Sequence, residues 1–247
     1  MHPTQFAYKQ GHSTEAALHA VVRGIEQSCF NKQFALGLFL DIEGAFNNVS
    51  FRAVETALQE ANIESPLVTW IVNMLSSQTV TATLGDHSRT VHVRRGTPQG
   101  GVLSPLLFNL VMDRLLANLS TVQGIYAQAY ADDIIILGCG IDSATISSRV
   151  QEGLYAVQNW TEHCGLSIST GKTTAVMFTW RRNWKYHPLK LGNAQIGLTD
   201  RAVYLGVTLD AKLSWIPHIT SRTAKANRCL SACRRACLLY TSDAADE

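Results

Sequence analysis

The sequence predicts an α+β fold, in which a mixed or antiparallel sheet has helices packed on one face. Three observations indicate this class. Short apolar runs rich in β-branched and aromatic residues are mixed with segments whose apolar residues have helical spacing. Some of the short runs are joined by tight turns, as in hairpins. The chain has 247 residues, of which 46% are hydrophobic and 16% charged, so it can bury a substantial core.

The first elements are a helix, a buried strand and two more helices. Helical spacing of apolar residues predicts a helix from Ser13 to about Cys29. The continuous apolar run Phe34–Leu40 is typical of a buried central strand, and it ends abruptly at Asp41. Ser50 can cap a helix that continues to about Ala61. Ser65-Pro66 opens the next helix, which continues to about Ser76.

The middle of the chain is expected to form a hairpin, a loop and a long helix. Gln78–Arg95 has the pattern of a hairpin that turns at Gly85-Asp86. The segment Gly96–Gly101, called the glycine loop below, has the sequence GTPQGG. Ser104-Pro105 then provides an N-cap and a first-turn proline for a helix to about Leu119.

The last elements alternate between strands and helices. A hairpin turns at Tyr130-Ala131-Asp132-Asp133, and a helix follows from about Asp142 to Cys164. The remaining predictions are strands near Thr174–Thr179, Lys190–Gly192 and Ala202–Leu209, and a basic helix from Trp215 to about Ala236.

Two adjacent carboxylates lie at the tip of this last hairpin. Asp132 and Asp133 are flanked by the apolar runs Ile125–Ala129 and Ile134–Gly138. Placing two like charges together is unfavourable, and a divalent cation would relieve that cost because carboxylate oxygens are the ligands that Mg²⁺ prefers. The alternative for an isolated Asp-Asp pair is a solvated acidic turn.

Two further segments could complete a site for phosphoryl transfer. If the strand ending at Asp41 pairs beside the acidic hairpin, three carboxylates converge and could hold two Mg²⁺ ions. Alone, Asp41 would be a strand-ending cap. The glycine loop offers backbone N–H groups and the side-chain amide of Gln99 to a nucleotide, although such a cluster also occurs in ordinary turns.

The charge distribution is strongly asymmetric. Residues 1–164 contain nine Lys/Arg and fourteen Asp/Glu, whereas residues 165–236 contain twelve Lys/Arg and two acids. A basic final third beside an acidic body favours a polyanion held by one part and processed by another. A solvated basic surface is the alternative.

Six segments resemble the motifs of reverse transcriptases, and they follow each other in the order of that family. Together they extend over residues 5–236, and the residues within the motifs resemble those of LINE-type, non-LTR retrotransposon enzymes. The matches are Gln5–Leu18 to the finger segment before motif A, Phe39–Val49 (FLDIEGAFNNV) to motif A, Gly96–Asn109 (GTPQGGVLSPLLFN) to motif B, Tyr130–Asp133 (YADD) to motif C, Gly165–Ser169 with Lys172-Thr173 to motif D, and Tyr204–Val207 (YLGV) to motif E.

The resemblance implies a right-hand polymerase with a palm, partial fingers and a partial thumb within residues 1–236. The fingers would comprise residues 1–33 and 50–95, the palm 34–49 and 96–200, and the start of the thumb 201–236. Upstream finger motifs that contact the triphosphate are expected to lie outside this chain. Residues 237–247 resemble a translated sequencing-library adapter, and we expect them not to be native.

By position, Asp41, Asp132 and Asp133 match the catalytic carboxylates of the family. The resemblance implies that they hold two Mg²⁺ ions, for which Mn²⁺ could substitute, and that the Ile42 carbonyl adds a ligand. Asn47 and Asn48 stand where many relatives have Asp and then Asn, which should be tolerable if that position lies outside the metal shell.

Other motif positions imply contacts with an incoming dNTP. Phe46 matches the aromatic steric gate against a ribose 2′-OH, Gln99 and Gly100 match the nucleotide-contacting part of motif B, and Ala131 would lie near the primer end or the nucleotide. Lys172 matches the motif D lysine, a candidate proton donor to pyrophosphate. The alternatives are a core role for Phe46, a turn amide for Gln99 and a surface cation for Lys172.

The implied partners are an RNA template, a DNA primer and dNTPs, without a membrane. Trp180 and Trp184 could stack on bases or be buried. The cations expected to follow template–primer phosphates are Arg181, Arg182, Lys185, Arg222, Lys225 and Arg228, with Arg234 and Arg235 on the same basic helix.

Two functions are compatible with these features. The first is an RNA-directed DNA polymerase fragment that extends a DNA 3′-OH, and the second is a non-catalytic nucleic-acid-binding remnant or domesticated module. An RNA-directed RNA polymerase would share the palm, but Phe46 and Ala131 argue against it. Six cysteines without regular spacing indicate reduced thiols inside a cell, and the resemblance implies synthesis in the cytoplasm and action in the nucleus.

Overall fold

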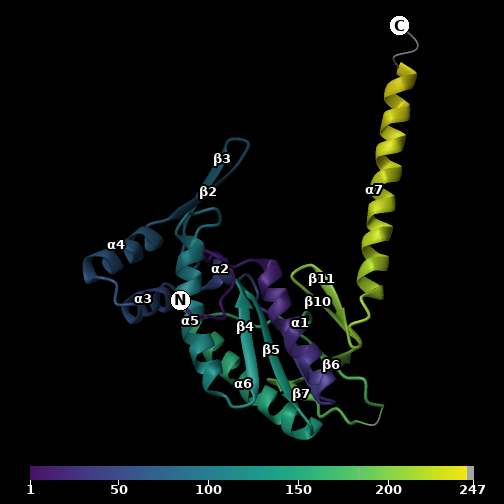
Figure 1. Cartoon of the computed structure of the whole chain (residues 1–247). Coiled ribbons are helices and arrows are strands. Elements are labelled where there is room, and N and C mark those ends of the chain that lie inside the picture. Colours follow the sequence, from purple (N-terminus) through teal and green to yellow (C-terminus); the bar gives the residue numbers. More distant parts are fainter. Residues whose placement is uncertain (183, 244–247) are drawn as a thin grey trace.

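A five-stranded mixed sheet forms the centre of the molecule (Figure 1). The computed structural model describes residues 1–182 and 184–243, and from residue 236 onward only the course of the backbone. The strand order is β4-β5-β1-β6-β9, and neighbours are antiparallel except for the parallel pair β6–β9. The strand bounds are β1 Phe34–Asp41, β4 Ile125–Tyr130, β5 Asp133–Gly140, β6 Thr174–Phe178 and β9 Leu198–Thr199.

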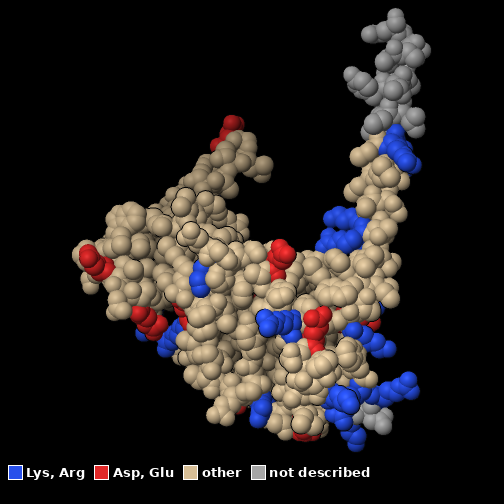
Figure 2. Space-filling view, viewed as in Figure 1, with Lys and Arg blue, Asp and Glu red and all other residues tan. Residues whose placement is uncertain are grey.

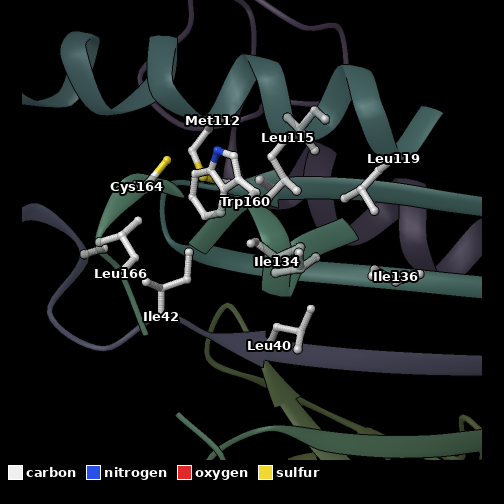
Figure 3. Close-up of a cluster of buried hydrophobic side chains, with 14 of the residues drawn as sticks. Leu40, Ile42, Met112, Leu115, Leu119, Ile134, Ile136, Trp160, Cys164 and Leu166 are labelled. Carbon is white, nitrogen blue, oxygen red and sulfur yellow. The ribbon is translucent and has the colours of Figure 1, made fainter. Parts of the chain in front are cut away.

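The α+β prediction is confirmed, as is the central position of β1. Two long helices, α5 (Ser104–Thr121) and α6 (Ser143–Cys164), cover one face of the sheet. Figure 3 shows how their side chains meet those of β1 and β5 in one buried cluster. Met112 and Leu115 come from α5, Trp160 comes from α6, and Leu40 and Ile134 come from the strands.

The prediction of helices on one face is incomplete, because α1 (Thr14–Phe30) packs on the opposite face. The reason lies in β1, whose first seven residues are all buried. Alternate residues of a strand point to opposite faces, so a strand buried throughout requires cover on both sides. Val21 and Ile25 of α1 supply it against Phe39 and Ile135.

Polar side chains cap three of the helices that the sequence predicts, while the predicted cap at Ser104 is wrong. The side chains of Ser13, Ser50 and Asp142 accept hydrogen bonds from backbone N–H groups at the starts of α1, α3 and α6. Ser104 is the first helical residue rather than the N-cap, because its hydroxyl donates instead to the Pro98 carbonyl at 2.7 Å. The other helices of this half are α2 Ala45–Asn48, α3 Phe51–Glu60 and α4 Ser65–Ser76.

Two elements project from the body on the same side (Figure 1). One is the hairpin of β2 (Thr79–Leu84) and β3 (His87–His92), whose residues are all exposed and which turns at Gly85-Asp86 as predicted. The other is α7 (Ile216–Asp243), which continues past its predicted end. The adapter interpretation of residues 237–247 stays a prediction, since side chains from 236 and the backbone from 244 lie outside the described part.

The segment predicted as one strand, Ala202–Leu209, is instead a hairpin. It consists of β10 (Arg201–Tyr204) and β11 (Val207–Asp210). Leu205 and Gly206 have φ values of 47° and 77°, and these left-handed conformations turn the chain back on itself. A smaller hairpin precedes it, formed by β7 (Leu189–Leu191) and β8 (Ala194–Ile196).

Tyr204 ties the second hairpin to the central sheet. Its hydroxyl accepts a hydrogen bond from Gln128 Nε2 at 3.0 Å, and the same amide donates to the Ala17 carbonyl of α1 at 2.9 Å. The Tyr126 hydroxyl donates to Gln128 Oε1 at 2.8 Å. The Tyr204 ring also lies 5.9 Å from the Phe39 ring, centroid to centroid. These contacts join α1, β1, β4 and β10 in one polar and aromatic cluster.

The described cysteines, Cys29, Cys139, Cys164, Cys229 and Cys233, are all free thiols. Within residues 1–182 and 184–243, the helices lack an apolar stretch of the length that a bilayer requires.

Candidate active site

Register brings the acidic residues to one end of the sheet, called the carboxylate end below. Asp41, the last residue of β1, is paired directly with Asp133, the first residue of β5. Tyr130 also pairs with Asp133, so Ala131 and Asp132 form a two-residue turn, with φ of 55° at Ala131. The predicted pairing of the first strand beside the acidic hairpin is therefore confirmed. Because side chains alternate along strands, Asp41 and Asp133 lie on the face covered by α1.

Lys172 contacts this group directly. Its Nζ lies 3.1 Å from Asp41 Oδ2 and 3.4 Å from Oδ1. The segment that carries Lys172 is held by backbone hydrogen bonds to the end of β1, from Ser169 N–H to the Asp41 carbonyl and from Glu43 N–H to the Ser167 carbonyl, both 2.9 Å.

Electrostatics at this end are dominated by partial burial of like charges. Burial raises the pKa of Asp132, and the charge of Asp41 adds to that effect, while a backbone hydrogen bond and Lys172 oppose it. Burial, followed by the charges of Asp132 and Asp41, raises the pKa of Asp133 to about 6. The single positive charge of Lys172 opposes this shift but does not cancel it.

The oxygen atoms at this end are of the kind that binds a hard divalent cation, but they are not gathered around a single point. Carboxylate oxygens, with a backbone carbonyl, are the ligands that Mg²⁺ and Mn²⁺ take. Among the described residues, none donates a hydrogen bond to the Ile42 carbonyl, so its oxygen is available. Yet no three described His, Cys, Asp or Glu side chains are gathered as a metal site. Since Lys172 contacts both oxygens of Asp41, this lysine competes with a metal ion for that carboxylate.

The glycine loop docks on the segment that follows Asp41. Gly96 N–H donates to the Val49 carbonyl at 2.7 Å, and Thr97 N–H donates to the Phe46 carbonyl at 2.6 Å. Gly96 has φ of 91°, and a Cβ there would lie 2.5 Å from the Asn47 carbonyl oxygen. Only glycine permits this approach, so the loop position depends on Gly96.

The predicted nucleotide-binding residues take three different positions. Gln99 and Gly100 are exposed at the tip of a turn closed by Gly101 N–H to the Pro98 carbonyl. Phe46 is half-buried, with its ring 4.8 Å from that of Phe108 in α5. Ala131 is buried in the acidic turn. The structure thus brings Phe46 and the glycine loop together.

The structure does not bring the predicted nucleic-acid contacts together. Arg181, Arg182 and Lys185 follow β6 at the opposite end of the sheet from Asp41, because Ala35 near the start of β1 pairs with Phe178. The cations Arg222, Lys225 and Arg228 lie along the projecting α7, where Arg222 donates to the Gly206 carbonyl. Figure 2 shows Lys and Arg side chains along α7 and, separately, at the far end of the body.

Sequence reasoning missed several residues that hold the site in place. Thr97 is buried and binds the Phe46 carbonyl with both its N–H and its hydroxyl. The Thr173 hydroxyl donates to the Ser169 carbonyl at 2.7 Å and shapes the turn that carries Lys172. Asn109 is buried and donates to the Ala7 carbonyl at 2.8 Å. For Asn109 the available signal was a polar residue within an otherwise apolar segment, which predicts a buried hydrogen bond. Thr97 and Thr173 lie in polar, glycine-containing segments that offer no such signal.

An acidic strand end beside an acidic hairpin turn, with a glycine loop docked against it, defines a nucleic-acid polymerase palm. The family described as reverse transcriptase (RNA-dependent DNA polymerase) matches residues 1–209. The chain belongs to this family. Enzymes of the family use divalent metal ions.

Curated relatives are non-LTR retrotransposon proteins. The chain is 29% identical over 224 residues to the RNA-directed DNA polymerase from mobile element jockey of Drosophila melanogaster, covering 88% of the chain and 24% of that protein. It is 27% identical over 235 residues to the Pol polyprotein of retrotransposable element R1 from Bradysia coprophila, and the match covers 94% of the chain and 23% of that protein. The chain therefore spans about a quarter of the length of these relatives.

A solved structure supports the fold alone. Apo telomerase from Candida tropicalis, truncated of its C-terminal domain, superposes with a TM-score of 0.55 over 78% of this chain and 38% of that one. The sequence identity is 11%.

Proposed function

We propose that the chain is part of an RNA-directed DNA polymerase of a non-LTR retrotransposon, which extends a DNA 3′-OH with dNTPs on an RNA template. The observation that carries the proposal is the direct pairing of Asp41 with Asp133 beside the turn that holds Asp132. The order of motifs in the sequence and the names of the relatives support it.

The carboxylates are the proposed metal ligands. Asp41, Asp132 and Asp133, with the Ile42 carbonyl, would hold two Mg²⁺ ions, and Mn²⁺ is a possible substitute. Such ions, when bound, activate the attacking hydroxyl and stabilise the leaving oxygen of an in-line displacement. Burial and the neighbouring negative charges disfavour the ionised forms of Asp132 and Asp133 and raise their pKa values, and bound cations would relieve that cost.

The neighbouring side chains are proposed to select and orient the nucleotide. Phe46 would exclude a ribose 2′-OH, and its packing on Phe108 limits the movement of its ring. Gln99 and Gly100, exposed on the docked loop, would contact the nucleotide, and Ala131 would support the primer end. Lys172 would leave Asp41 and donate a proton to the departing pyrophosphate.

The domain division and the partners complete the proposal. Fingers would occupy residues 1–33 and 50–95, the palm 34–49 and 96–200, and the thumb start 201–236. Arg222, Lys225 and Arg228 on α7 would follow the phosphates of the template–primer duplex. Synthesis in the cytoplasm and action in the nucleus are expected from the same family.

A primer-extension assay on poly(rA)/oligo(dT) tests the function. We expect Mg²⁺-dependent incorporation of dTTP, reduced by about 10³-fold or more in Asp132→Asn, since loss of metal-based charge stabilisation costs several kcal/mol. Asp86→Asn, in the exposed β2–β3 turn, is the matched control and should retain activity.

The assay is performed with this chain and with the longest reading frame that contains it. Synthesis that is absent in both forms, or that is equal in wild type and Asp132→Asn, would contradict the proposal. Retained RNA binding without synthesis would favour the alternative, a non-catalytic nucleic-acid-binding remnant.

A further inference from the structure

A cavity of about 560 Å³ lies at the end of the sheet opposite the carboxylates, called the basic end below. Three segments meet there, because Phe34 pairs with Gly140 and Ala35 pairs with Phe178. The segments are the link from α1 to β1, the end of β5, and the chain leaving β6. Residues that line the cavity include Asn31, Lys32, Gln33, Ile141, Trp180 and Arg181.

The cations of this cavity are held on short, hydrogen-bonded segments. Lys32 has φ of 55°, and its N–H donates to the Cys29 carbonyl at 3.0 Å, which closes the turn after α1. Arg181 N–H donates to Thr179 Oγ1 at 3.1 Å, and the guanidinium carbon lies 4.8 Å from the centroid of the Phe34 ring. Arg181 is therefore supported on an aromatic face while remaining exposed.

The aromatic residue of this cavity is unusually exposed. Trp180 has 65% of its surface accessible, whereas Trp184 packs against the main hydrophobic core. The sequence allowed either tryptophan to stack on a base or to be buried, and in the structure Trp180 alone of the two is exposed. An exposed indole beside two cations is the combination with which proteins bind single-stranded nucleic acids, by stacking on a base and neutralising phosphates.

The surrounding charge favours a polyanion. Residues 165–199 contain no acidic residue, and Arg182 and Lys185 follow Arg181. Acids near the lining residues include Glu26, whose charge acts on Cys29, and Asp142, which follows Ile141. Asp210 precedes Ala211, whose carbonyl accepts a hydrogen bond from Thr179 N–H. Asp142 is occupied as the N-cap of α6, where Thr145 donates to it through both its N–H and its hydroxyl. Exposed Ile141 and Phe30 could instead bind a protein, but the charge favours nucleic acid.

We propose that this cavity binds single-stranded nucleic acid, with one base stacked on Trp180 and the adjacent phosphates on Lys32 and Arg181. The amides of Asn31 and Gln33 supply hydrogen-bond groups for the base edge. The cavity and Asp41 lie at opposite ends of the eight-residue strand β1, about 23 Å apart at the rise of a strand. It is therefore a binding site separate from the reacting end, and it operates without metal or dNTPs.

The test measures binding of a short fluorescein-labelled oligouridylate, and of the matching oligothymidylate, by anisotropy in EDTA without nucleotides. Trp180→Ala should weaken binding about tenfold, because stacking on an aromatic side chain is worth about 1–3 kcal/mol per base. Trp70→Ala removes a tryptophan of similar exposure, 56%, on α4 and should leave binding unchanged. Arg181→Glu should also weaken binding.

A second readout locates the site and keeps the proposal falsifiable. Photocrosslinking with 5-iodouridine RNA should label the peptide that contains Trp180 in wild type and in Asp132→Asn alike. The proposal is overturned if wild type, Trp180→Ala and Trp70→Ala bind with equal affinity, or if only other peptides are labelled. It is also overturned if the protein self-associates and does not bind RNA. Binding of either oligonucleotide supports the proposal, and the one that binds more tightly shows whether the site prefers RNA or DNA. Because neither readout needs synthesis, failure of the polymerase proposal leaves this test intact.

Discussion

The two ends of the central strand β1 are built in opposite ways. At the carboxylate end, backbone hydrogen bonds lock the glycine loop and the Lys172 segment against partly buried acids. At the basic end, side chains of Lys32, Trp180 and Arg181 face solvent around a cavity. A group that must act on reacting atoms requires fixed geometry, whereas a surface that receives a flexible strand requires exposed charge and stacking area.

The largest expected effect tests whether the carboxylate end is fixed by its backbone. Gly96→Ala should destabilise the protein by about 3–5 kcal/mol, because the new Cβ would lie 2.5 Å from a carbonyl oxygen and the residue has positive φ. Urea unfolding measures this loss. Gly192→Ala, in the β7–β8 turn with φ of 58° and no atom within 4 Å, should cost only about 1 kcal/mol. Equal losses in the two variants would show that the close approach at Gly96 is unimportant.

A smaller effect tests the electrostatics of the same end. The folded pKa of Asp133 is about 6, above the ordinary 3.8, so the unfolded state binds fewer protons between these values. Stability should therefore fall as pH rises from 4 to 6, relative to Asp133→Asn. After allowance for partial exposure the difference should be about 1 kcal/mol. Urea midpoints measured across this range in EDTA give the comparison, and parallel curves for the two proteins would contradict the raised pKa.

The smallest effect concerns the ion pair that closes the carboxylate end. Lys172→Ala should tighten Mn²⁺ binding a few-fold, because the ammonium no longer competes for Asp41, and a pair this exposed is worth at most about 1 kcal/mol. Titration of Mn²⁺ followed by electron paramagnetic resonance measures the affinity. Lys185→Ala, at the other end, should leave it unchanged. Weaker Mn²⁺ binding in Lys172→Ala would show that the lysine supports the site rather than blocks it.

Elements with local signals could be predicted from the sequence. Ser13, Ser50 and Asp142 marked helix starts, and the Gly85-Asp86 pair marked a hairpin, because caps and turns depend on neighbouring residues. Ser104 failed as a cap because its hydroxyl finds a partner six residues earlier in the chain.

Features that depend on the assembled sheet could not be predicted. The turn at Leu205-Gly206 lies inside an apolar segment whose pattern continues across it. The positions of the acids relative to one another followed from the motif order, but the placement of Arg181 did not. Its charge is visible in the sequence, whereas the end of the sheet at which it lies is set by the antiparallel pairing of β6 with β1.

The contacts of Tyr204 connect the base of the projecting helix α7 to the strands that carry the acids. At the root of α7, Arg222 holds the Gly206 carbonyl and His218 Nδ1 accepts from Thr208 N–H at 3.2 Å. Tyr204 lies just before this turn. It accepts a hydrogen bond from Gln128 of β4, and its ring packs against Phe39 of β1. Gln128 lies two residues before the end of β4, which leads into the acidic turn, and Phe39 lies two residues before Asp41 at the end of β1. One set of hydrogen bonds and aromatic contacts therefore joins the base of α7 to both of the strands that lead to the carboxylates.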